Sequence, residues 1–260
     1  MRTVIAVGNQ KGGVAKTTTT VSLGAALVER GLEVLAVDLD PQANLSLSLG
    51  VNAASLRHGV ADILLGNSPV VSVSRETSVL GLDLLPANTG MHLVEKFLTV
   101  RHSYEYALRQ ALGQMEAYDI VLCDCPPSVG AIPYTALTAA DLLLIPTQCE
   151  YFSTHGLGAV LDLVTRVRER TNPSLSYRIL ATMFDRQNRV HRTVLEQLRG
   201  AFPAAVLETV IEIDTKLRES QVFGQPITRY APNSQAALQY RALAEELSVY
   251  VRREKSPQPA

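Results

Sequence analysis

The sequence of 260 residues contains no tryptophan, only three cysteines and no long hydrophobic run. Cys123, Cys125 and Cys149 form no recognisable disulfide framework and lack the spacing of a zinc site. No apolar stretch approaches the ~18 residues of a membrane-spanning helix, and the N-terminus lacks the charged-then-apolar layout of a signal peptide. We therefore expect a cytoplasmic protein with no membrane partner.

The chain also lacks a strong net charge, which is −1 with 24 basic and 25 acidic residues. This balance alone does not indicate a nucleic-acid partner. The charge is unevenly distributed, however, because residues 164–200 contain eight arginines and three acidic residues. The segment forms either a local basic face on an otherwise acidic molecule or a set of solvated helix faces.

With 47% hydrophobic residues, the chain is expected to fold around a sizeable core. Short apolar runs alternate with helical patterns, which predicts βαβ units. We expect an α/β fold: a single three-layer P-loop domain over residues 1–255, with a mostly parallel central sheet, helices on both faces, and a flexible tail over residues 256–260. The predicted strands are Thr3–Val7, Val34–Val37, Leu82–Leu85, Ile120–Cys123, Leu142–Ile145, Ile179–Met183 and Leu207–Ile211. The predicted helices are Thr17–Arg30, Ser103–Ala117, Gly156–Arg170, Val190–Phe202 and Ser234–Arg253.

A glycine-rich loop, GNQKGGVAKTTTT, follows the first predicted strand and opens the first predicted helix. This context favours a phosphate-binding loop, in which Gly12 and Gly13 let backbone N–H groups turn inward toward an anion. Lys16 is expected to reach the β- and γ-phosphates, and the Thr17 hydroxyl to complete a Mg²⁺ shell of phosphate oxygens and water. The nucleotide-binding residues predicted are Lys11, Gly12, Gly13, Val14, Ala15, Lys16, Thr17 and Thr18.

Two aspartates follow other predicted strands. Asp124 ends an apolar strand in DIVLCDCPPSVG, where a P-loop protein places the acid that holds the Mg²⁺ shell, here through a water molecule. Asp40 in VDLDPQAN lies on a loop that is expected near the γ-phosphate, where a carboxylate can orient an attacking water. Asp38 is the weaker candidate, since it can equally serve a structural role.

Together, these motifs resemble the ParA/Soj partition ATPases of the deviant-Walker (ParA/MinD) class. The resemblance extends over nearly the whole chain and rests on NQKGGVAKTTT, VDLDPQAN, DCPPSVG, PTQCEYFSTHGL and DTKLRESQVFGQPITRYAPNSQAALQYRALAEEL. It implies a slow, partner-stimulated ATPase with ATP and Mg²⁺ as cofactors. It further implies that Lys11 is the signature lysine, which reaches the phosphates bound by the partner in an ATP-bound homodimer. Lys11, Lys16 and Asp40 are then the catalytic residues.

Ala15 departs from the form KGGVGKT that is commonest in this family. A methyl group there is expected to be tolerated if the backbone has a negative φ. The change bears on nucleotide affinity or turnover rate, and we expect nucleotide binding itself to be retained.

The resemblance also gives the arginine-rich segment a function. An ATP-bound dimer of this family binds double-stranded DNA without sequence preference, and a ParB-like or other cargo adaptor stimulates the hydrolysis that releases it. We therefore expect a nucleoid-associated protein that segregates or positions cargo. Phosphate contacts of this kind are sensitive to salt. The DNA-binding candidates are Arg189 and Lys216, followed by Arg186, Arg192 and Arg218.

Three other functions remain as alternatives. A MinD-like ATPase would position the division machinery or another cargo, but attaches to membranes through a C-terminal amphipathic helix that the sequence lacks. An electron-transfer protein like the nitrogenase iron protein would need cluster-binding cysteines at a different place. A biosynthetic ATPase resembling dethiobiotin synthetase would have no use for a basic DNA-binding surface.

Overall fold

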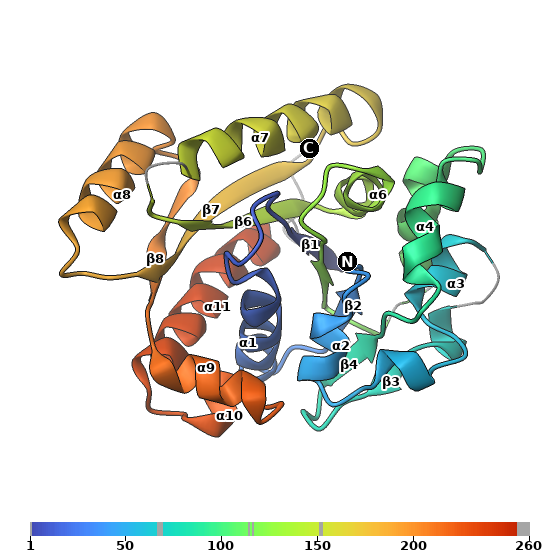
Figure 1. Cartoon of the computed structure of the whole chain (residues 1–260), viewed down its shortest axis with the longest axis horizontal. Helices are drawn as coiled ribbons and strands as arrows, with labels where there is room; N and C mark the ends of the chain where they lie inside the picture. Colours follow the sequence, from blue (N-terminus) through green and yellow to red (C-terminus); the bar gives the residue numbers. More distant parts are fainter. Residues whose placement is uncertain (1, 67–69, 114, 116, 151–152, 254–260) are drawn as a thin grey trace.

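A single eight-stranded sheet forms the centre of the computed structural model, which describes residues 2–66, 70–113, 115, 117–150 and 153–253 (Figure 1). The strand order is β3-β4-β2-β5-β1-β6-β7-β8. Every neighbouring pair is parallel except β3 and β4. The strands are β1 Thr3–Val7, β2 Val34–Asp38, β3 Arg75–Glu76, β4 Leu82–Leu85, β5 Ile120–Asp124, β6 Leu142–Gln148, β7 Ser176–Phe184 and β8 Val206–Glu212.

Helices connect the parallel strands and cover both faces of the sheet. They are α1 Lys16–Val28, α2 Asn44–Ser48, α3 Val60–Leu64, α4 Met91–Leu98, α5 Ala107–Gly113, α6 Ala131–Ala139, α7 Ser153–Arg170, α8 Arg189–Ala201, α9 Thr215–Val222, α10 Ile227–Tyr230 and α11 Gln235–Arg253. Short 3₁₀ turns occur at Ala53–Ser55, Val70–Ser72 and Tyr104–Tyr106. The predicted fold class, a three-layer α/β P-loop fold with a mostly parallel sheet, is confirmed.

The core consists of one hydrophobic cluster on each face of the sheet. On one face, α1, α9, α10 and α11 pack against the strands. On the other face, α3 to α8 do the same. All residues of β1, β2 and β5 are buried, as expected for parallel strands covered on both sides. This burial explains why these strands appear in the sequence as continuous apolar runs.

All seven predicted strands are present; two have the predicted bounds, and five extend one to three residues beyond a predicted end. The long predicted helices are present as well, although the segment predicted as Ser103–Ala117 is divided into a 3₁₀ turn and α5. The predicted tail, residues 256–260, lies outside the described residues. None of the helices in the described ranges combines the length and hydrophobicity needed to cross a membrane.

Parallel strands bring their C-terminal ends to one edge of the sheet, which is where ligands bind in such folds. The last residue of β5, Asp124, pairs with both Val7 at the end of β1 and Asp38 at the end of β2. The loops that follow these three strands therefore converge. The ends of β7 and β8 also lie on this edge, as Phe184 pairs with Glu212.

Candidate functional site

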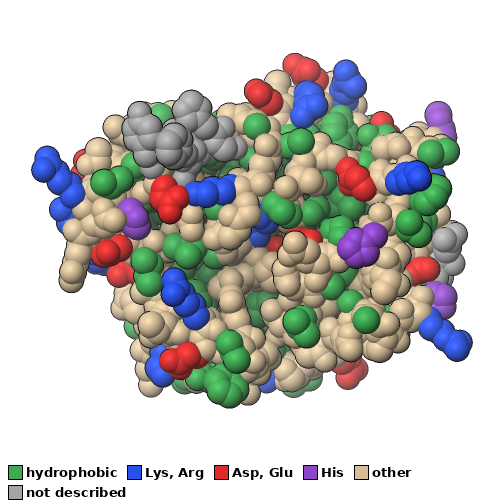
Figure 2. Space-filling model, viewed as in Figure 1, with side chains coloured by type: hydrophobic (Ala, Val, Ile, Leu, Met, Phe, Trp, Pro, Cys, Tyr) green, Lys and Arg blue, Asp and Glu red, His purple; other side chains and the backbone are tan. Residues whose placement is uncertain are grey.

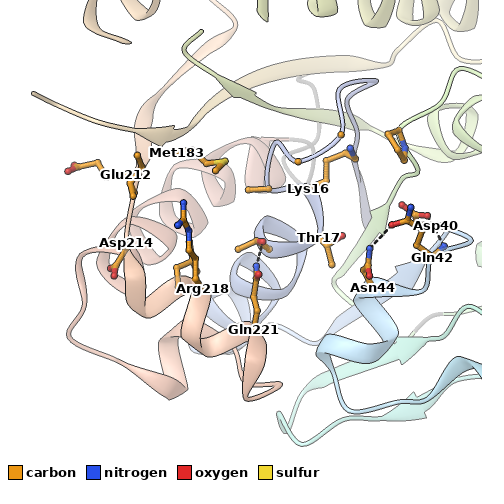
Figure 3. A pocket seen from close by; sticks show the side chains of 17 residues that line it. Lys16, Thr17, Asp40, Gln42, Asn44, Met183, Glu212, Asp214, Arg218 and Gln221 are labelled. Carbon is orange, nitrogen blue, oxygen red and sulfur yellow. Dashed lines mark hydrogen bonds between the residues drawn. The ribbon is translucent and has the colours of Figure 1, made fainter. Parts of the chain in front are cut away.

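A cavity of about 550 Å³ opens at this edge of the sheet (Figure 3). Its wall is built from the loop before α1, the loop after β2, the ends of β7 and β8, and helix α9. It is lined by Gly12, Gly13, Ala15, Lys16, Thr17, Thr18, Asp40, Gln42, Asn44, Pro127, Met183, Glu212, Ile213, Asp214, Leu217, Arg218 and Gln221.

The Asn9 side chain fixes the loop between β1 and α1 by one hydrogen bond within the loop and one to strand β6. The Asn9 side chain accepts a hydrogen bond from the backbone N–H of Lys11 at 3.0 Å and donates one to the Pro146 carbonyl at 2.8 Å. Gly13 has a φ of 73°, and no atom lies within 4 Å of the place where its Cβ would be. The first turn of α1 therefore offers free N–H groups and its positive dipole end to an anion in the cavity.

Ala15 does not meet the condition under which its methyl group was expected to be tolerated, a negative φ. Ala15 adopts the left-handed conformation, with φ 66° and ψ 33°, at the N-cap of α1, and its side chain makes no capping hydrogen bond. A left-handed residue with a Cβ costs about 1–2 kcal/mol. The alanine that replaces the family's usual glycine thus introduces local strain at the phosphate-binding loop.

Ala15→Gly is expected to raise the free energy of unfolding by about 1 kcal/mol, because glycine adopts this conformation without the Cβ penalty. Urea denaturation without nucleotide measures the change. Ser103→Gly is a matched control, since Ser103 is also left-handed, with φ 55°, and does not line the cavity. A stability gain in the Ser103 variant and none in the Ala15 variant would contradict strain at the loop.

Lys16 points from the start of α1 into the cavity (Figure 3) and is largely buried. Its Nζ donates a hydrogen bond to the Lys11 carbonyl at 3.0 Å. Burial lowers the pKa of this amine, while the carboxyls of Asp124 and Asp40 oppose the shift. A buried, incompletely neutralised ammonium is suited to bind a ligand of high negative charge.

Asp124 provides a buried carboxylate beside the first turn of α1. Thr17 Oγ1 donates a hydrogen bond to it at 2.6 Å, and Thr20 Oγ1 a longer one at 3.4 Å. Burial, followed by the nearby Asp38 carboxyl, raises the pKa of Asp124 to about 8. No lysine or arginine in the described ranges forms an ion pair with it within 4 Å.

These oxygens fit a Mg²⁺ ion, which prefers hard oxygen ligands and would supply the missing positive charge. The described residues hold no group of three or more His, Cys, Asp or Glu side chains that could form a complete metal site. A cation bound beside Thr17 and Asp124 would thus need phosphate oxygens and water for the rest of its shell, as expected for a metal that arrives with a nucleotide.

The two aspartates after β2 have different environments. Asp40 lines the cavity, and its Oδ1 accepts a hydrogen bond from the backbone N–H of Gln42 at 2.9 Å. Asp38 is fully buried away from the lining and accepts hydrogen bonds from the Ser46 N–H and hydroxyl at 2.8 and 2.6 Å. Burial raises the pKa of Asp38 to about 6. Asp38 thus fixes the loop through Ser46, and Asp40 is the carboxylate that faces the cavity.

Lys11 belongs to the same loop as Lys16 but does not line the cavity. Its Nζ donates hydrogen bonds to Gln148 Oε1 at 3.0 Å and to Glu150 Oε2 at 2.6 Å, and a third of the side chain, 36%, is exposed. The last residue of β6 and Glu150, just after that strand, therefore hold this amine at the surface. The two lysines of the loop occupy different places, one inside the cavity and one outside it.

The predicted DNA-binding residues of the loops after β7 and β8 lie close together. The Ile213 N–H donates to the Phe184 carbonyl at 3.0 Å, and Arg186 forms an ion pair with Glu212 at 2.7 Å. Basic and acidic side chains alternate over α8 and α9 at the left of Figure 2. The surface is therefore mixed in charge and is not uniformly basic.

The DNA-binding candidates differ in whether their side chains already form ion pairs or hydrogen bonds within the protein. Lys216 forms an ion pair with Glu219 at 2.8 Å, and Arg192 Nη1 donates to the Arg186 carbonyl at 2.7 Å. Arg189, at the start of α8, is exposed and has no hydrogen-bond or ion-pair partner among the described residues. Arg189 is thus the candidate with the most freely available charge.

The sequence analysis did not predict the cavity wall that lies opposite the phosphate-binding loop. It assigned Arg218, which lies on that wall, to the DNA-binding surface alone. Arg218 lines the cavity wall opposite the phosphate-binding loop, as do several residues to which the sequence analysis assigned no role. The signal that could have found them is their position at or after the C-terminal ends of parallel strands, namely β2, β5, β7 and β8. The missed lining residues are Gln42, Asn44, Pro127, Met183, Glu212, Ile213, Asp214, Leu217 and Gln221.

Comparison with known proteins agrees with this site. The profile of the family described as "AAA domain" matches residues 2–177. The chain is 38% identical to the chromosome partitioning protein ParA of Caulobacter vibrioides, over 94% of this chain and 93% of that protein. It is 39% identical to the sporulation initiation inhibitor protein Soj of Bacillus subtilis, over 95% of this chain and 99% of that protein.

Among solved structures, the chain is similar to cobyrinic acid a,c-diamide synthase from Mycobacterium smegmatis with bound ATP analogue and magnesium. The two proteins are 36% identical, with a TM-score of 0.86, and the match covers 100% of each chain. The motifs, the cavity beside the loop and the similarity to ParA and Soj over nearly the full length agree with one another. The chain belongs to the ParA/Soj family of partition ATPases, within the P-loop proteins.

Proposed function

We propose that the chain is an ATP-dependent dimeric switch that binds DNA non-specifically and hydrolyses ATP to segregate or position a cargo in the cell. The observation that carries this proposal is the separation of the two loop lysines. Lys16 lies in the cavity, whereas Lys11 lies outside it on the surface. An amine placed in this way can serve a second copy of the chain.

ATP binds in the cavity with its phosphates at the first turn of α1. Backbone N–H groups of the loop and the Lys16 amine hold the phosphates. Thr17 and Asp124 would hold a Mg²⁺ ion, which neutralises phosphate charge and orients the β- and γ-phosphates when bound. Asp40, on the cavity wall, orients the water that attacks the γ-phosphate.

Dimerisation depends on ATP because burying the Lys11 amine between two chains is favourable only when phosphates are present to pair with it. The amine must first leave Gln148 and Glu150. Loss of the γ-phosphate removes part of the opposing charge, so hydrolysis weakens the dimer. Two DNA-binding surfaces joined in one dimer bind DNA more tightly than one surface alone.

Arg189 and Lys216 are the main DNA contacts in this proposal, with Arg186 and Arg192 beside them. Their loops lie together at one edge of the sheet, and the contacts would be with phosphates and not with bases. A ParB-like or other cargo adaptor would stimulate hydrolysis and release the dimer from the nucleoid. Support for this part comes from the partition proteins that the chain resembles.

A biosynthetic ATPase is a second candidate, favoured by the name of the similar mycobacterial structure, a diamide synthase. Such an enzyme would use ATP to activate a small carboxylate substrate and would need no DNA. ATP-dependent DNA binding therefore separates the two candidates. If the protein binds ATP but does not bind DNA, whether ATP is present or absent, the biosynthetic function is favoured.

The decisive experiment compares Lys11→Ala and Arg189→Glu in the presence of a non-hydrolysable ATP analogue. Light scattering reports the dimer, and fluorescence anisotropy with a labelled DNA duplex reports DNA binding at several salt concentrations. We expect Lys11→Ala to lose both the dimer and tight DNA binding while it still binds ATP. Arg189→Glu is expected to keep the dimer and weaken DNA binding about 10-fold or more.

Wild-type DNA binding is expected to weaken steeply as salt increases, because phosphate contacts release counterions. A monomeric wild-type protein at every concentration with the ATP analogue would contradict the proposed switch. DNA binding that hardly changes with salt would contradict the basic surface.

A further inference from the structure

Arg218, on α9, is one of two cationic side chains that line the cavity in the described part of the chain, and Lys16 is the other. The two come from opposite walls, since Lys16 begins α1 and Arg218 lies across the opening. Figure 3 shows the Arg218 side chain projecting from α9 into the cavity. Its position differs from that of Lys216 on the same helix, which does not line the cavity.

Three carboxylates lie near Arg218, in sequence or on the cavity wall, and each already accepts hydrogen bonds from other residues. Glu212 accepts hydrogen bonds from Arg186 and Gln239. The other two acids are engaged in the same way: Asp214 accepts from the N–H groups of Lys216 and Ala236, and Glu219 accepts from the Lys216 amine and the Tyr230 hydroxyl. Within the described residues, the Arg218 side chain has neither a hydrogen bond nor an ion pair.

The position of α9 shows which part of a nucleotide this charge would meet. The Gln221 amide donates a hydrogen bond to the Thr18 hydroxyl, so α9 is joined to the first turn of α1. Arg218 lies three residues before Gln221, on the same side of the helix. Its guanidinium is therefore close to the N-terminus of α1, at the end of the cavity away from Asp40.

The wall around Arg218 is otherwise suited to a nucleoside. Met183, Ile213 and Leu217 line this end with apolar surface, which fits the faces of a base. With the terminal phosphates at Lys16 and Asp40 and the base against Met183, Ile213 and Leu217, the α-phosphate lies beside the first turn of α1, where the Arg218 side chain faces the cavity. That is the part of the nucleotide within reach of Arg218.

We propose that Arg218 is a nucleotide-binding residue that pairs with the α-phosphate of ATP and ADP. The inference rests on the proposed function only in taking an adenine nucleotide as the ligand. A guanidinium presents a planar fork of N–H donors that matches two phosphate oxygens. Because ATP and ADP share the α-phosphate, this contact persists through hydrolysis, in contrast to the contact of Lys11 with the partner's phosphates.

Calorimetric titration with ATP and with ADP tests the proposal in wild type, Arg218→Ala and Arg218→Gln. We expect both variants to bind ATP and ADP about 10- to 100-fold more weakly, by the same factor for the two nucleotides. Arg218→Lys is expected to recover part of the loss, since an amine keeps the charge without the fork. Arg199→Ala is the control, because Arg199 pairs with Glu208 on the surface and does not line the cavity, and it is expected to bind both nucleotides as wild type does.

DNA binding separates this role from a direct DNA contact. With the ATP analogue at saturation, the DNA affinity of Arg218→Ala is expected to equal that of wild type, because only nucleotide occupancy is impaired. Unchanged affinity for both nucleotides would overturn the proposal, and so would a loss confined to ATP, which would place the contact at the γ-phosphate. A wild-type protein that binds no adenine nucleotide would instead refute the proposed function itself.

Discussion

Replacing Lys16 with alanine is expected to reduce the affinity for ATP about 1000-fold. The side chain is largely buried on the cavity wall, and its Nζ donates a hydrogen bond to the Lys11 carbonyl at 3.0 Å. Removing one partner of a buried charge pair costs about 3–5 kcal/mol. With 1.4 kcal/mol for each factor of ten, the loss of the amine opposite the phosphates corresponds to about three orders of magnitude.

Lys16→Met provides the control for folding, because methionine keeps most of the side-chain volume and removes only the charge. Burial lowers the pKa of the Lys16 amine, so folding disfavours its charged form. The methionine variant without nucleotide is therefore expected to unfold at a temperature no lower than that of wild type, while calorimetry finds no ATP binding. Normal ATP affinity in a folded Lys16 variant would refute the assignment of the phosphate-binding loop.

Sequence patterns predicted the central sheet because its strands are apolar on both sides and are separated by glycine and proline signals. The same patterns missed α6, which is buried over eight of its nine residues and thus has no polar face to produce a helical period. They also missed α2, α3 and α10, since a helix of four or five residues is too short to show a period at all.

At the site, local motifs predicted the residues that lie in or beside one loop. The P-loop lysine and threonine, Asp40 and Asp124 are all brought together because their strands end at one edge of the sheet. The three features that motifs did not predict have different physical origins. The left-handed backbone of Ala15 is set by the turn that the loop must make, and an alanine gives no sign of it.

The cavity position of Arg218 and the pairing of Lys11 with Glu150 depend on contacts between distant parts of the chain. Arg218 reaches the cavity because α9 is docked against α1 through Gln221 and Thr18, which lie 203 positions apart in sequence. Lys11 meets Glu150 because β6 pairs with β1. A spacing rule that works within one motif carries no information about such contacts.

Asp124→Asn is expected to remove most of the effect of Mg²⁺ on ATP binding, about 10- to 100-fold in affinity. The asparagine keeps the size of the side chain and can still pair with the Thr17 hydroxyl, which lies 2.6 Å from the carboxylate. It lacks the negative charge that a cation beside Thr17 requires. Calorimetry with and without EDTA measures the difference, and a variant with the full Mg²⁺ effect would show that Asp124 has no part in holding the ion.

The same substitution is expected to change how stability depends on pH in protein free of nucleotide and Mg²⁺. Burial raises the pKa of Asp124 from 3.8 to about 8, so between these values the folded protein keeps a proton that the unfolded chain has lost. Wild type therefore loses stability as pH rises through this range. Asparagine does not titrate, and Asp124→Asn is thus expected to gain stability relative to wild type between pH 5 and pH 8, as urea denaturation measures.

Asp38 is also fully buried, and its pKa is raised to about 6. It therefore makes the free energy of unfolding depend on pH at the acidic end of the range in both proteins. An equal difference in unfolding free energy at both pH values would mean that the Asp124 carboxyl is already ionised in the folded protein, and burial would then not govern its charge.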